Sequence, residues 1–356
     1  MGARDRRETR EWCFNYFRLG GILKDLEFDQ RLCIGNFLCS DQSSPSLINL
    51  LKLNNIPDPD KIYWPLVQKI EYVSMHYPGF DINDIFPAND LVSEKLSLYD
   101  FQISLLKKPF TWIRIRKNYL KEVLTELNER KILFQSAEDP CAIAFPQNSK
   151  LDTLDCYEKG YFEIQDYSSQ KTKEFMRPSQ GEKWWDACAG SGGKSLLLKE
   201  AEPGIDLVAT DVRANILFNY DLRMKKANHN SYTVNIWKDA GIPQLSGERF
   251  DGIVADVPCS GSGTWSRTPE WLKQSVFPDI TGKYVPLQRR IVSKAVESLK
   301  KGFPLIYITC SVFRNENEDN IDFFSNNLPL RLEKCAYLEG YSIGADTLFA
   351  ARMIKV

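Results

Sequence analysis

The second half of the chain predicts an α/β fold in which helices cover both faces of a largely parallel sheet. From about residue 160 onward, apolar runs typical of buried strands alternate with stretches of helical periodicity. This alternation favours parallel strands joined by crossover helices, because such a sheet must bury both faces. The predicted strands are 183–187, 205–210, 250–255, 303–308 and 348–354. A helix is predicted over 287–299, with Gly302 as its stop signal.

Two smaller segments precede this domain, which we place at residues 159–356. Residues 1–98 carry aromatic and leucine residues at helical spacing, which predicts a helical accessory domain without recognisable chemistry. Residues 99–158 alternate like a strand over 111–115, show an amphipathic helix over 119–130, and end in a second strand over 141–145. A β-α-β unit of this length is half of a ferredoxin-like (RRM-like) α+β sandwich, an architecture used by many RNA-binding modules.

The bulk composition is that of an ordinary soluble globular protein, with 43% hydrophobic and 26% charged residues. Lys+Arg 46 against Asp+Glu 47 leaves a net charge of -1, so any contact with a polyanion requires a local patch. No run approaches the roughly 20 apolar residues of a membrane span. The nine cysteines are odd in number and lack CxxC spacing, which argues against a disulfide framework and a metal site. We therefore expect a cytoplasmic protein with no membrane partner and no metal.

A run of basic residues without an intervening acidic residue lies near the start of the second segment. Its members are Lys107, Lys108, Arg114, Arg116, Lys117 and Lys121. Such a run is commonly a solvated face. The interleaved Phe110 and Trp112 are also typical of a surface that contacts RNA, so both interpretations stay open. On the second interpretation, Arg114, Arg116 and Lys117 are the candidate RNA contacts.

A glycine-rich turn follows the first predicted strand of the sheet. Its candidate ligand-binding residues are Cys188, Ala189, Gly190, Ser191, Gly192, Gly193 and Lys194. Glycines let the backbone approach a ligand closely, and the helix that follows offers free N–H groups at its start. The P-loop pattern G-x-x-x-x-G-K-[ST] fits positions 188–195 except the first, where Cys188 replaces the required glycine.

An acidic residue at the end of the next strand separates the two possible ligands of this turn. Asp211 follows the turn by about 20 residues, where a carboxylate suits the hydroxyl groups of a ribose. A triphosphate would gain nothing from it. Asp239, after the apolar stretch 232–237, is a second candidate and would contact the base. We therefore favour an adenosine-type cofactor over a nucleoside triphosphate.

Two cysteines occupy near-identical surroundings. Cys259 lies in Asp-Val-Pro-Cys-Ser and Cys310 in Tyr-Ile-Thr-Cys-Ser, each directly after a predicted strand. Open α/β sheets place their ligands at such strand ends. One thiol of this kind would be taken for a core cysteine, because free cysteine is among the most buried residue types. Two at equivalent positions predict a pair acting on one substrate, although the surroundings do not say which is the nucleophile.

Taken together, these motifs resemble the Sun-type RNA cytosine-5 methyltransferases of the RsmB/RsmF kind. The resembling segments, in the order that the family has them, are 162–169, 186–194, 256–263, 267–270, 307–311 and 316–320. The resemblance implies a Rossmann-like methyltransferase sheet and transfer of a methyl group from S-adenosyl-L-methionine to C5 of a cytosine in RNA. It favours ribosomal RNA over tRNA as the substrate, and we expect a monomer.

The same resemblance assigns roles to the site residues. It implies that Cys310 is the nucleophile that adds to C6 of the cytosine and that Cys259 assists product release. Asp256 would hold the N3/N4 edge of the cytosine and also border the cofactor. Arg267 lies in a matching motif and is a fourth candidate RNA contact.

The chain departs from the family pattern in two places. It has Gly190-Ser191 where the family usually has Ala-Pro, and Ser266 where a second arginine is frequent. Residues 1–98 are the place of a NusB-like RNA-binding domain if the family's organisation extends there. Two alternatives stay open beside the methyltransferase. One is a non-catalytic RNA-binding or ribosome assembly factor on the same fold, and the other is a P-loop-like NTPase.

Overall fold

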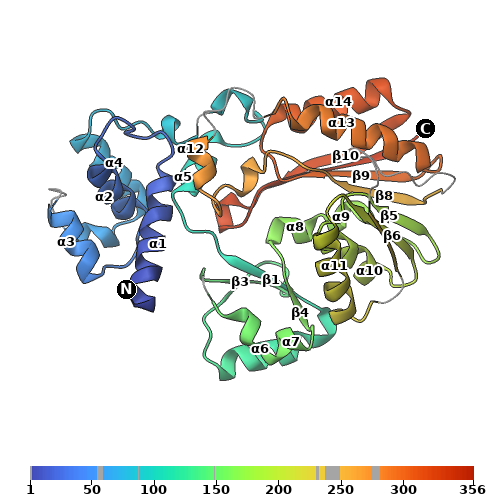
Figure 1. The fold of residues 1–356 in the computed structure, drawn as a ribbon, viewed down its shortest axis with the longest axis horizontal. Helices are drawn as coiled ribbons and strands as arrows, with labels where there is room; N and C mark the ends of the chain where they lie inside the picture. The colour runs from blue at the N-terminus through green and yellow to red at the C-terminus, as the bar shows by residue number, and fades with distance from the viewer. Residues whose placement is uncertain are drawn as a thin grey trace. The chain divides into compact units, whose positions relative to one another are not determined.

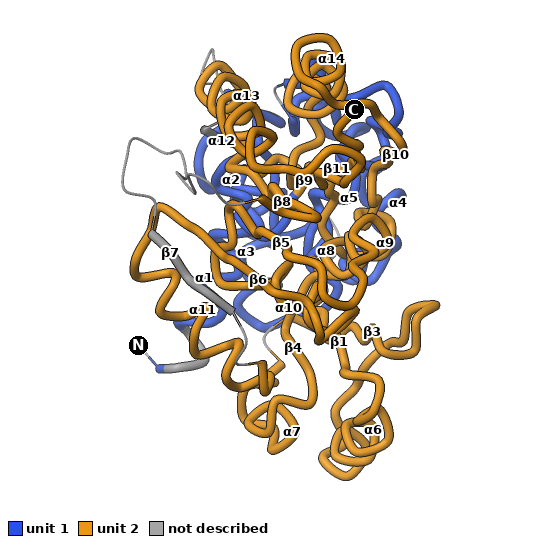
Figure 2. Tube along the Cα trace, turned by 90° about the vertical axis from the view of Figure 1, so that its right-hand side faces the viewer, with its two compact units in different colours: residues 1–108, 264–280 blue, residues 109–263, 281–356 orange. Residues whose placement is uncertain are grey.

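The structure, a computed structural model, describes residues 2–53, 59–86, 88–147, 149–229, 232–236, 249–274 and 281–356. The chain divides into two compact units (Figure 2). The first comprises residues 1–108 and 264–280, and the second comprises residues 109–263 and 281–356. The first unit thus extends past residue 98 and includes a stretch, 264–280, that the sequence analysis assigned to the 159–356 domain.

The first unit is helical in its described part, as predicted for the amino-terminal region (Figure 1). Its helices are α1 (Ala3–Arg18), α2 (Phe28–Cys39), α3 (Pro45–Leu53), α4 (Leu66–His76), α5 (Leu98–Leu105) and α12 (Glu270–Gln274). Helix α2 packs against both α1 and α4. Gly35 permits the close approach of α1 and α2, because a Cβ there would lie 2.6 Å from the carbonyl oxygen of Asn15. Trp265 is buried against Phe86, which joins residues 264–280 to the rest of this unit.

A four-stranded sheet with ferredoxin-like topology opens the second unit. Its strands are β1 (Thr111–Ile115), β2 (Gln135–Ser136), β3 (Ala142–Phe145) and β4 (Phe162–Ile164), in the order β2-β3-β1-β4. Helix α6 (Leu120–Glu129) follows β1 and helix α7 (Asp155–Glu158) follows β3, which completes the predicted half to a full β-α-β-β-α-β unit. Strand β4 lies beyond residue 158, so this sheet extends past the predicted end of the 99–158 segment. Val123 and Leu127 of α6 pack on Ile113 and Ile143 of the sheet.

A seven-stranded sheet forms the centre of the second unit. Its strands are β5 (Lys183–Asp186), β6 (Asp206–Asp211), β7 (Tyr232–Ile236), β8 (Gly252–Asp256), β9 (Pro304–Thr309), β10 (Leu330–Leu338) and β11 (Leu348–Lys355). Their order is β10-β11-β9-β8-β5-β6-β7, and only the pairs β11–β9 and β10–β11 are antiparallel. The chain runs outward from β5 to β7 and returns to β8 on the other side of β5. This reversal makes a topological switch point, where open α/β sheets bind ligands.

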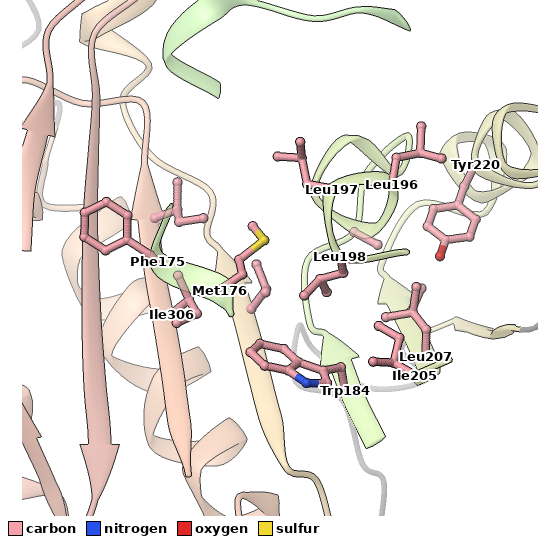
Figure 3. Packing of buried hydrophobic residues seen from close by; sticks show 14 of the residues in the cluster. Phe175, Met176, Trp184, Leu196, Leu197, Leu198, Ile205, Leu207, Tyr220 and Ile306 are labelled. Carbon is pink, nitrogen blue, oxygen red and sulfur yellow. The ribbon is translucent and has the colours of Figure 1, made fainter. Parts of the chain in front are cut away.

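Helices cover both faces of this sheet, as predicted. They are α9 (Lys173–Met176), α10 (Gly193–Ala201), α11 (Ala214–Lys226), α13 (Tyr284–Ala295) and α14 (Glu318–Asn327). The short helix α8 (Tyr167–Lys171) contacts α10 and strand β1 of the smaller sheet. Because neighbouring side chains of a strand point to opposite faces, Trp184 packs with α9, α10 and α11 whereas Trp185 packs with α13 and α14. Figure 3 shows the first of these layers, with Leu196, Leu197 and Leu198 of α10 beside the sheet. No helix in the described ranges is long and apolar enough to cross a bilayer.

Candidate active site

A cavity of about 470 Å³ lies at the carboxyl ends of β5, β6, β8 and β9. The predicted residues that line it are Cys188, Ala189, Gly190, Ser191, Gly193, Lys194, Asp211, Asp256, Cys259 and Cys310. The structure therefore brings the glycine-rich turn, the acidic residue of the next strand and both cysteine motifs to one place. Gly192 shapes the turn without lining the cavity. Asp239 lies outside the described residues.

The turn between β5 and α10 depends on two glycines with left-handed backbone conformation. Gly190 has φ +52° and Gly192 has φ +90°, a region that other residues adopt at a cost. A Cβ at Gly192 would also lie 2.8 Å from Cδ2 of Tyr220. The turn is fixed to strand β6, because the Ala189 N–H donates to the Thr210 carbonyl oxygen over 2.9 Å. The cavity wall at Gly190 is consequently backbone without a side chain, which allows a ligand to approach closely.

Asp211 ends strand β6 with its carboxylate held from two sides. The Gly190 N–H donates to its Oδ2 over 2.9 Å, and Nε of Arg213 donates to its Oδ1 over 2.9 Å. Burial by itself raises the pKa of Asp211, but the hydrogen bonds from Arg213 and Gly190 outweigh it and lower that pKa below the ordinary value. The group is therefore an oriented, ionised acceptor at the cavity, suited to ligand hydroxyl groups.

Asp186, the last residue of β5, lies fully buried below the turn. Ser195 Oγ of α10 donates a 2.7 Å hydrogen bond to its Oδ2, while its Oδ1 has no hydrogen-bond partner among the described residues. Burial raises the pKa of Asp186 to about 7, and the negative charge of Asp256 adds to the effect against the opposing Ser195 hydrogen bond. A fully buried carboxyl group with a raised pKa thus lies at the start of the glycine-rich turn.

Lys194 connects the turn to the first cysteine motif. Its Nζ lies 2.9 Å from Oδ2 of Asp256 and donates a 2.9 Å hydrogen bond to Ser169 Oγ. The side chain is buried, so this ion pair is screened less than a pair on the surface. A single ammonium group therefore joins the start of α10, the end of β8 and helix α8.

The two cysteines meet, although 51 positions separate them in the sequence. Their Sγ atoms lie 3.1 Å apart, and the Cys310 N–H donates to Cys259 Sγ over 3.3 Å. The hydrogen bond with the Cys310 thiol, burial and the charge of Glu316 raise the pKa of Cys259 well above its ordinary value. Burial, with nearby Asp186, likewise raises the pKa of Cys188. A raised pKa keeps the thiols of Cys259 and Cys188 protonated at neutral pH, so we expect Cys188 to contribute its backbone to the turn.

Several residues of the cavity were not predicted. Gln165 and Ser169 come from the segment between the two sheets, and Gln165 Nε2 donates to the Gly193 carbonyl oxygen over 3.3 Å. Arg213 and Arg223 also line the cavity. The resemblance marked 162–169 as a matching segment, but nothing in the sequence indicated that it reaches the turn.

The structure corrects the expectation that Arg114 and Arg116 face RNA. Arg114 is 6% exposed and pairs with Glu200 of α10, while its Nε donates to Gln165 Oε1 over 2.7 Å. Arg116 pairs with Glu163 over 2.7 Å and with Glu200 over 3.2 Å. Both guanidinium groups therefore join the ferredoxin-like sheet to helix α10 and are paired with carboxylates there.

The neighbouring contacts of the ferredoxin-like sheet agree with this correction. The ring of Trp112 lies 5.0 Å, centre to centre, from that of Tyr167 in α8, and Gln170 Nε2 donates to the Ile113 carbonyl oxygen over 3.1 Å. The sheet face opposite α6 is thus covered by helix α8. Lys117 is exposed, and Arg267 is half-buried in the first unit, so both stay predicted RNA contacts. No cluster of three or more potential metal ligands occurs among the described residues.

The sequence is similar to a known family of methyltransferases. The sequence model of a family described as 16S rRNA methyltransferase RsmB/F matches residues 173–352. Ribosomal RNA small subunit methyltransferase B of Pasteurella multocida is 32% identical over 276 residues, which cover 70% of this chain and 60% of the relative. The protein of the same name from Photorhabdus laumondii is 33% identical over 225 residues, covering 61% and 51%. The chain thus spans about half to 60% of the length of these relatives.

Solved structures share the fold. The crystal structure of PH0851 aligns with a TM-score of 0.71 at 24% identity, covering 91% of this chain and 81% of that one. The crystal structure of NSun6 from Pyrococcus horikoshii with SFG aligns with a TM-score of 0.66 at 18% identity, covering 76% and 98%. At these identities the likeness establishes the architecture.

Proposed function

The chain belongs to the RsmB/F methyltransferase family, and we propose that it transfers a methyl group from S-adenosyl-L-methionine to C5 of a cytosine in RNA. Ribosomal RNA is the favoured substrate over tRNA, because the relatives are named for it. The observation that carries the proposal is the pair of thiols 3.1 Å apart at the edge of the cavity. The P-loop alternative is set aside, because the matching family is one of methyltransferases. The monomeric state and cytoplasmic location stay predictions.

The residues of the cavity fit the proposed cofactor. A volume of about 470 Å³ lies in the range of small-molecule sites. The backbone of residues 190–193 would border the cofactor, and the oriented carboxylate of Asp211 would accept hydrogen bonds from its ribose hydroxyls. Asp239 stays a predicted contact of the base. When bound, S-adenosyl-L-methionine supplies an electrophilic methyl group on a sulfonium sulfur.

The chain's own residues would make the cytosine reactive. C5 is a poor nucleophile while the ring is aromatic, and a thiolate that adds to C6 makes C5 enamine-like, which divides one hard step into easier ones. We assign this addition to Cys310, the role that the resemblance to the Sun-type enzymes gives to this residue. Asp256, held by Lys194 over 2.9 Å, would bind the N3/N4 edge and stabilise the charge that develops on the ring.

Release follows from the same geometry. After methylation the C5 proton leaves to a base, its bonding electrons re-form the C5–C6 double bond, and the Cys310 sulfur departs as a thiolate. The Cys259 thiol lies 3.1 Å from that sulfur and is protonated, so it is placed to stabilise the departing thiolate by a hydrogen bond. The target base must be unstacked to reach the two cysteines, which favours a loop or an opened helix as substrate.

Transfer of labelled methyl from S-adenosyl-L-methionine to unmodified ribosomal RNA and tRNA tests the proposal. Wild type is compared with Cys310→Ala, Cys259→Ala and the control Cys335→Ala, which alters a half-buried thiol on β10 outside the cavity. We expect no transfer by Cys310→Ala, a protein–RNA adduct that survives denaturation in Cys259→Ala, and wild-type transfer by the control. An adduct only in Cys310→Ala would reverse the two roles. Cofactor binding without transfer to any RNA would favour the non-catalytic assembly factor.

A further inference from the structure

A buried polar network lies beneath the two cysteine loops, and the mechanism above gives it no role. It is centred on Glu316, the last residue of the 3-10 helix η8 (Arg314–Glu316), and on the adjacent Asn317. Both side chains are fully buried. Neither lines the cavity, so neither is placed to touch the cofactor.

Glu316 holds the loop of the first cysteine on both sides of Cys259. The Ser260 N–H donates to Oε1 of Glu316 over 2.9 Å, and the Ser260 hydroxyl donates to Oε2. Gln288 Nε2 donates to Oε1 of Glu316 over 2.9 Å and also to the Pro258 carbonyl oxygen over 2.9 Å. The residue before Cys259 and the residue after it are therefore anchored to the same carboxylate, one directly and one through Gln288.

Asn317 holds the loop of the second cysteine in the same manner. Its Nδ2 donates to the Ser311 carbonyl oxygen over 2.8 Å, and its Oδ1 accepts a 2.6 Å hydrogen bond from Thr309 Oγ1. These are the residues that flank Cys310. The two loops also meet directly, because the Ser260 and Ser311 hydroxyl oxygens lie 3.1 Å apart and the Ser260 oxygen can accept a hydrogen bond from Ser311.

Burying the Glu316 carboxylate costs desolvation free energy that a purely structural residue would not need to incur. A carboxylate taken out of water must recover its hydration through hydrogen bonds. Within the described part of the chain, the hydrogen-bond partners of the Glu316 carboxylate are the neutral donors of Ser260 and Gln288. An apolar side chain of similar size would avoid that cost but would leave the Ser260 N–H without its acceptor. The network is thus specific for the geometry of the cysteine loops.

We propose that Glu316 and Asn317 are positioning residues, each of which sets the place of one cysteine. Glu316 acts on Cys259 through Ser260 and Gln288, and Asn317 acts on Cys310 through Thr309 and Ser311. Two adjacent residues thereby fix the 3.1 Å separation of two sulfurs that come from different strands. The inference deepens the proposed function and rests on it.

The two positions make opposite predictions for the protein–RNA adduct. Glu316→Gln keeps the shape of the side chain but puts an NH2 group where a second acceptor is needed. It should displace Cys259, slow release roughly 10-fold, and let a denaturation-resistant adduct accumulate. Asn317→Asp replaces the donor to the Ser311 carbonyl oxygen by a carboxylate. It should displace Cys310 and slow adduct formation by roughly 10-fold.

Two further variants separate positioning from a general loss of stability. Asp251→Asn likewise replaces a buried carboxylate by an amide, just before β8 and at the opposite end of that strand from Cys259. This carboxylate accepts from the Lys183 N–H over 2.9 Å and pairs with Lys300 over 2.7 Å. The variant should leave adduct formation and release at wild-type rates. Glu316→Gln combined with Cys259→Ala should release no more slowly than Cys259→Ala alone, because Glu316 acts through that cysteine.

Each outcome of these adduct measurements either supports or overturns the inference. Opposite effects of Glu316→Gln and Asn317→Asp on adduct level support the inference, and reversed signs support it with the cysteine roles exchanged. Equal effects, effects matched by Asp251→Asn, or additive slowing in the double variant would overturn it while wild-type transfer keeps the proposed function. Absence of transfer by the wild type would overturn the proposed function, and the inference with it.

Discussion

The ammonium group of Lys194 lies 2.9 Å from Oδ2 of Asp256, so the cofactor turn and the first cysteine motif share a partly buried ion pair. The same Nζ donates to Ser169 Oγ over 2.9 Å. The lysine therefore fixes the carboxylate proposed to hold the cytosine to the helix that follows the cofactor turn. Losing this cation would leave a partly buried carboxylate unpaired at the point where the ring must dock.

Replacing Lys194 by methionine should lower the rate of methyl transfer by roughly 100-fold, since a small misplacement of a docking group costs about that much. The matched control is Lys199→Met on the same helix, whose ammonium group donates to the Ile205 carbonyl oxygen over 2.7 Å away from the cavity. Single-turnover transfer with both variants checks this. A Lys194→Met rate within twofold of the Lys199→Met rate would contradict the role given to the ion pair.

Asp211 should control the affinity for the cofactor without affecting that for RNA. In Asp211→Asn an NH2 group would face either the Gly190 N–H or the Arg213 guanidinium, both of which are donors. We expect the dissociation constant for S-adenosyl-L-methionine to rise about 10-fold, the loss of roughly one good hydrogen bond. Calorimetric titration with the cofactor measures it. Asp206→Asn, at the exposed start of the same strand, is the control and should bind like wild type.

The catalytic sheet was predictable where its strands are buried on both faces. Strands β5, β6, β8 and β9 appear in the sequence as short apolar runs, and each cysteine or acidic motif follows one directly. Strand β10 was missed because it pairs only with β11 at the sheet edge, and exposed Arg331, Glu333 and Lys334 interrupt its apolar pattern. Edge strands bury one side, so they lack the continuous apolar run that marks a central strand.

The sequence predicted which strand ends form the site, but it did not predict which side chains contact one another there. The motif 316–320 was visible in the sequence, but the function of Glu316 depends on Ser260 and Gln288, which only the fold brings together. Ser169 reaches Lys194 for the same reason. Arg114 was misassigned because its charge in the sequence does not reveal Glu200, the carboxylate that pairs with it in the fold.

Asp186 should make the free energy of unfolding depend on pH in a sense unusual for a carboxyl group. Its pKa is about 7 in the folded protein, against an ordinary value near 3.8. Between these pH values the folded state binds more protons than the unfolded state, so this group makes stability fall as pH rises, by at most about 1.4 kcal/mol per pH unit. Above about pH 7 the contribution of Asp186 to the free energy of unfolding no longer changes with pH.

Asp186→Asn removes this titration while keeping an oxygen that accepts from Ser195. The variant should therefore gain stability relative to wild type as pH increases from 5 to 7. Urea unfolding of both proteins without cofactor, at several pH values in that interval, measures the difference. A difference that stays constant with pH would show that Asp186 is ionised throughout and that its burial is compensated by other groups.

Variants of Arg114 and Lys117 should have different effects, although the two residues are only three positions apart. Arg114 stabilises the fold, whereas Lys117 is a candidate RNA contact. Arg114→Met leaves Glu200 paired with Arg116 alone and Gln165 Oε1 without its donor, so the free energy of unfolding should fall by roughly 3 kcal/mol. Lys117→Ala alters an exposed side chain and should change the free energy of unfolding by less than about 0.5 kcal/mol.

If Lys117 contacts a phosphate, its loss weakens RNA binding. It also reduces the slope of log binding constant against log salt concentration by about one. Urea unfolding, with RNA titrations at several salt concentrations under conditions where both variants are folded, measures these effects. Weaker RNA binding by Arg114→Met with unchanged stability would return Arg114 to the RNA-binding surface.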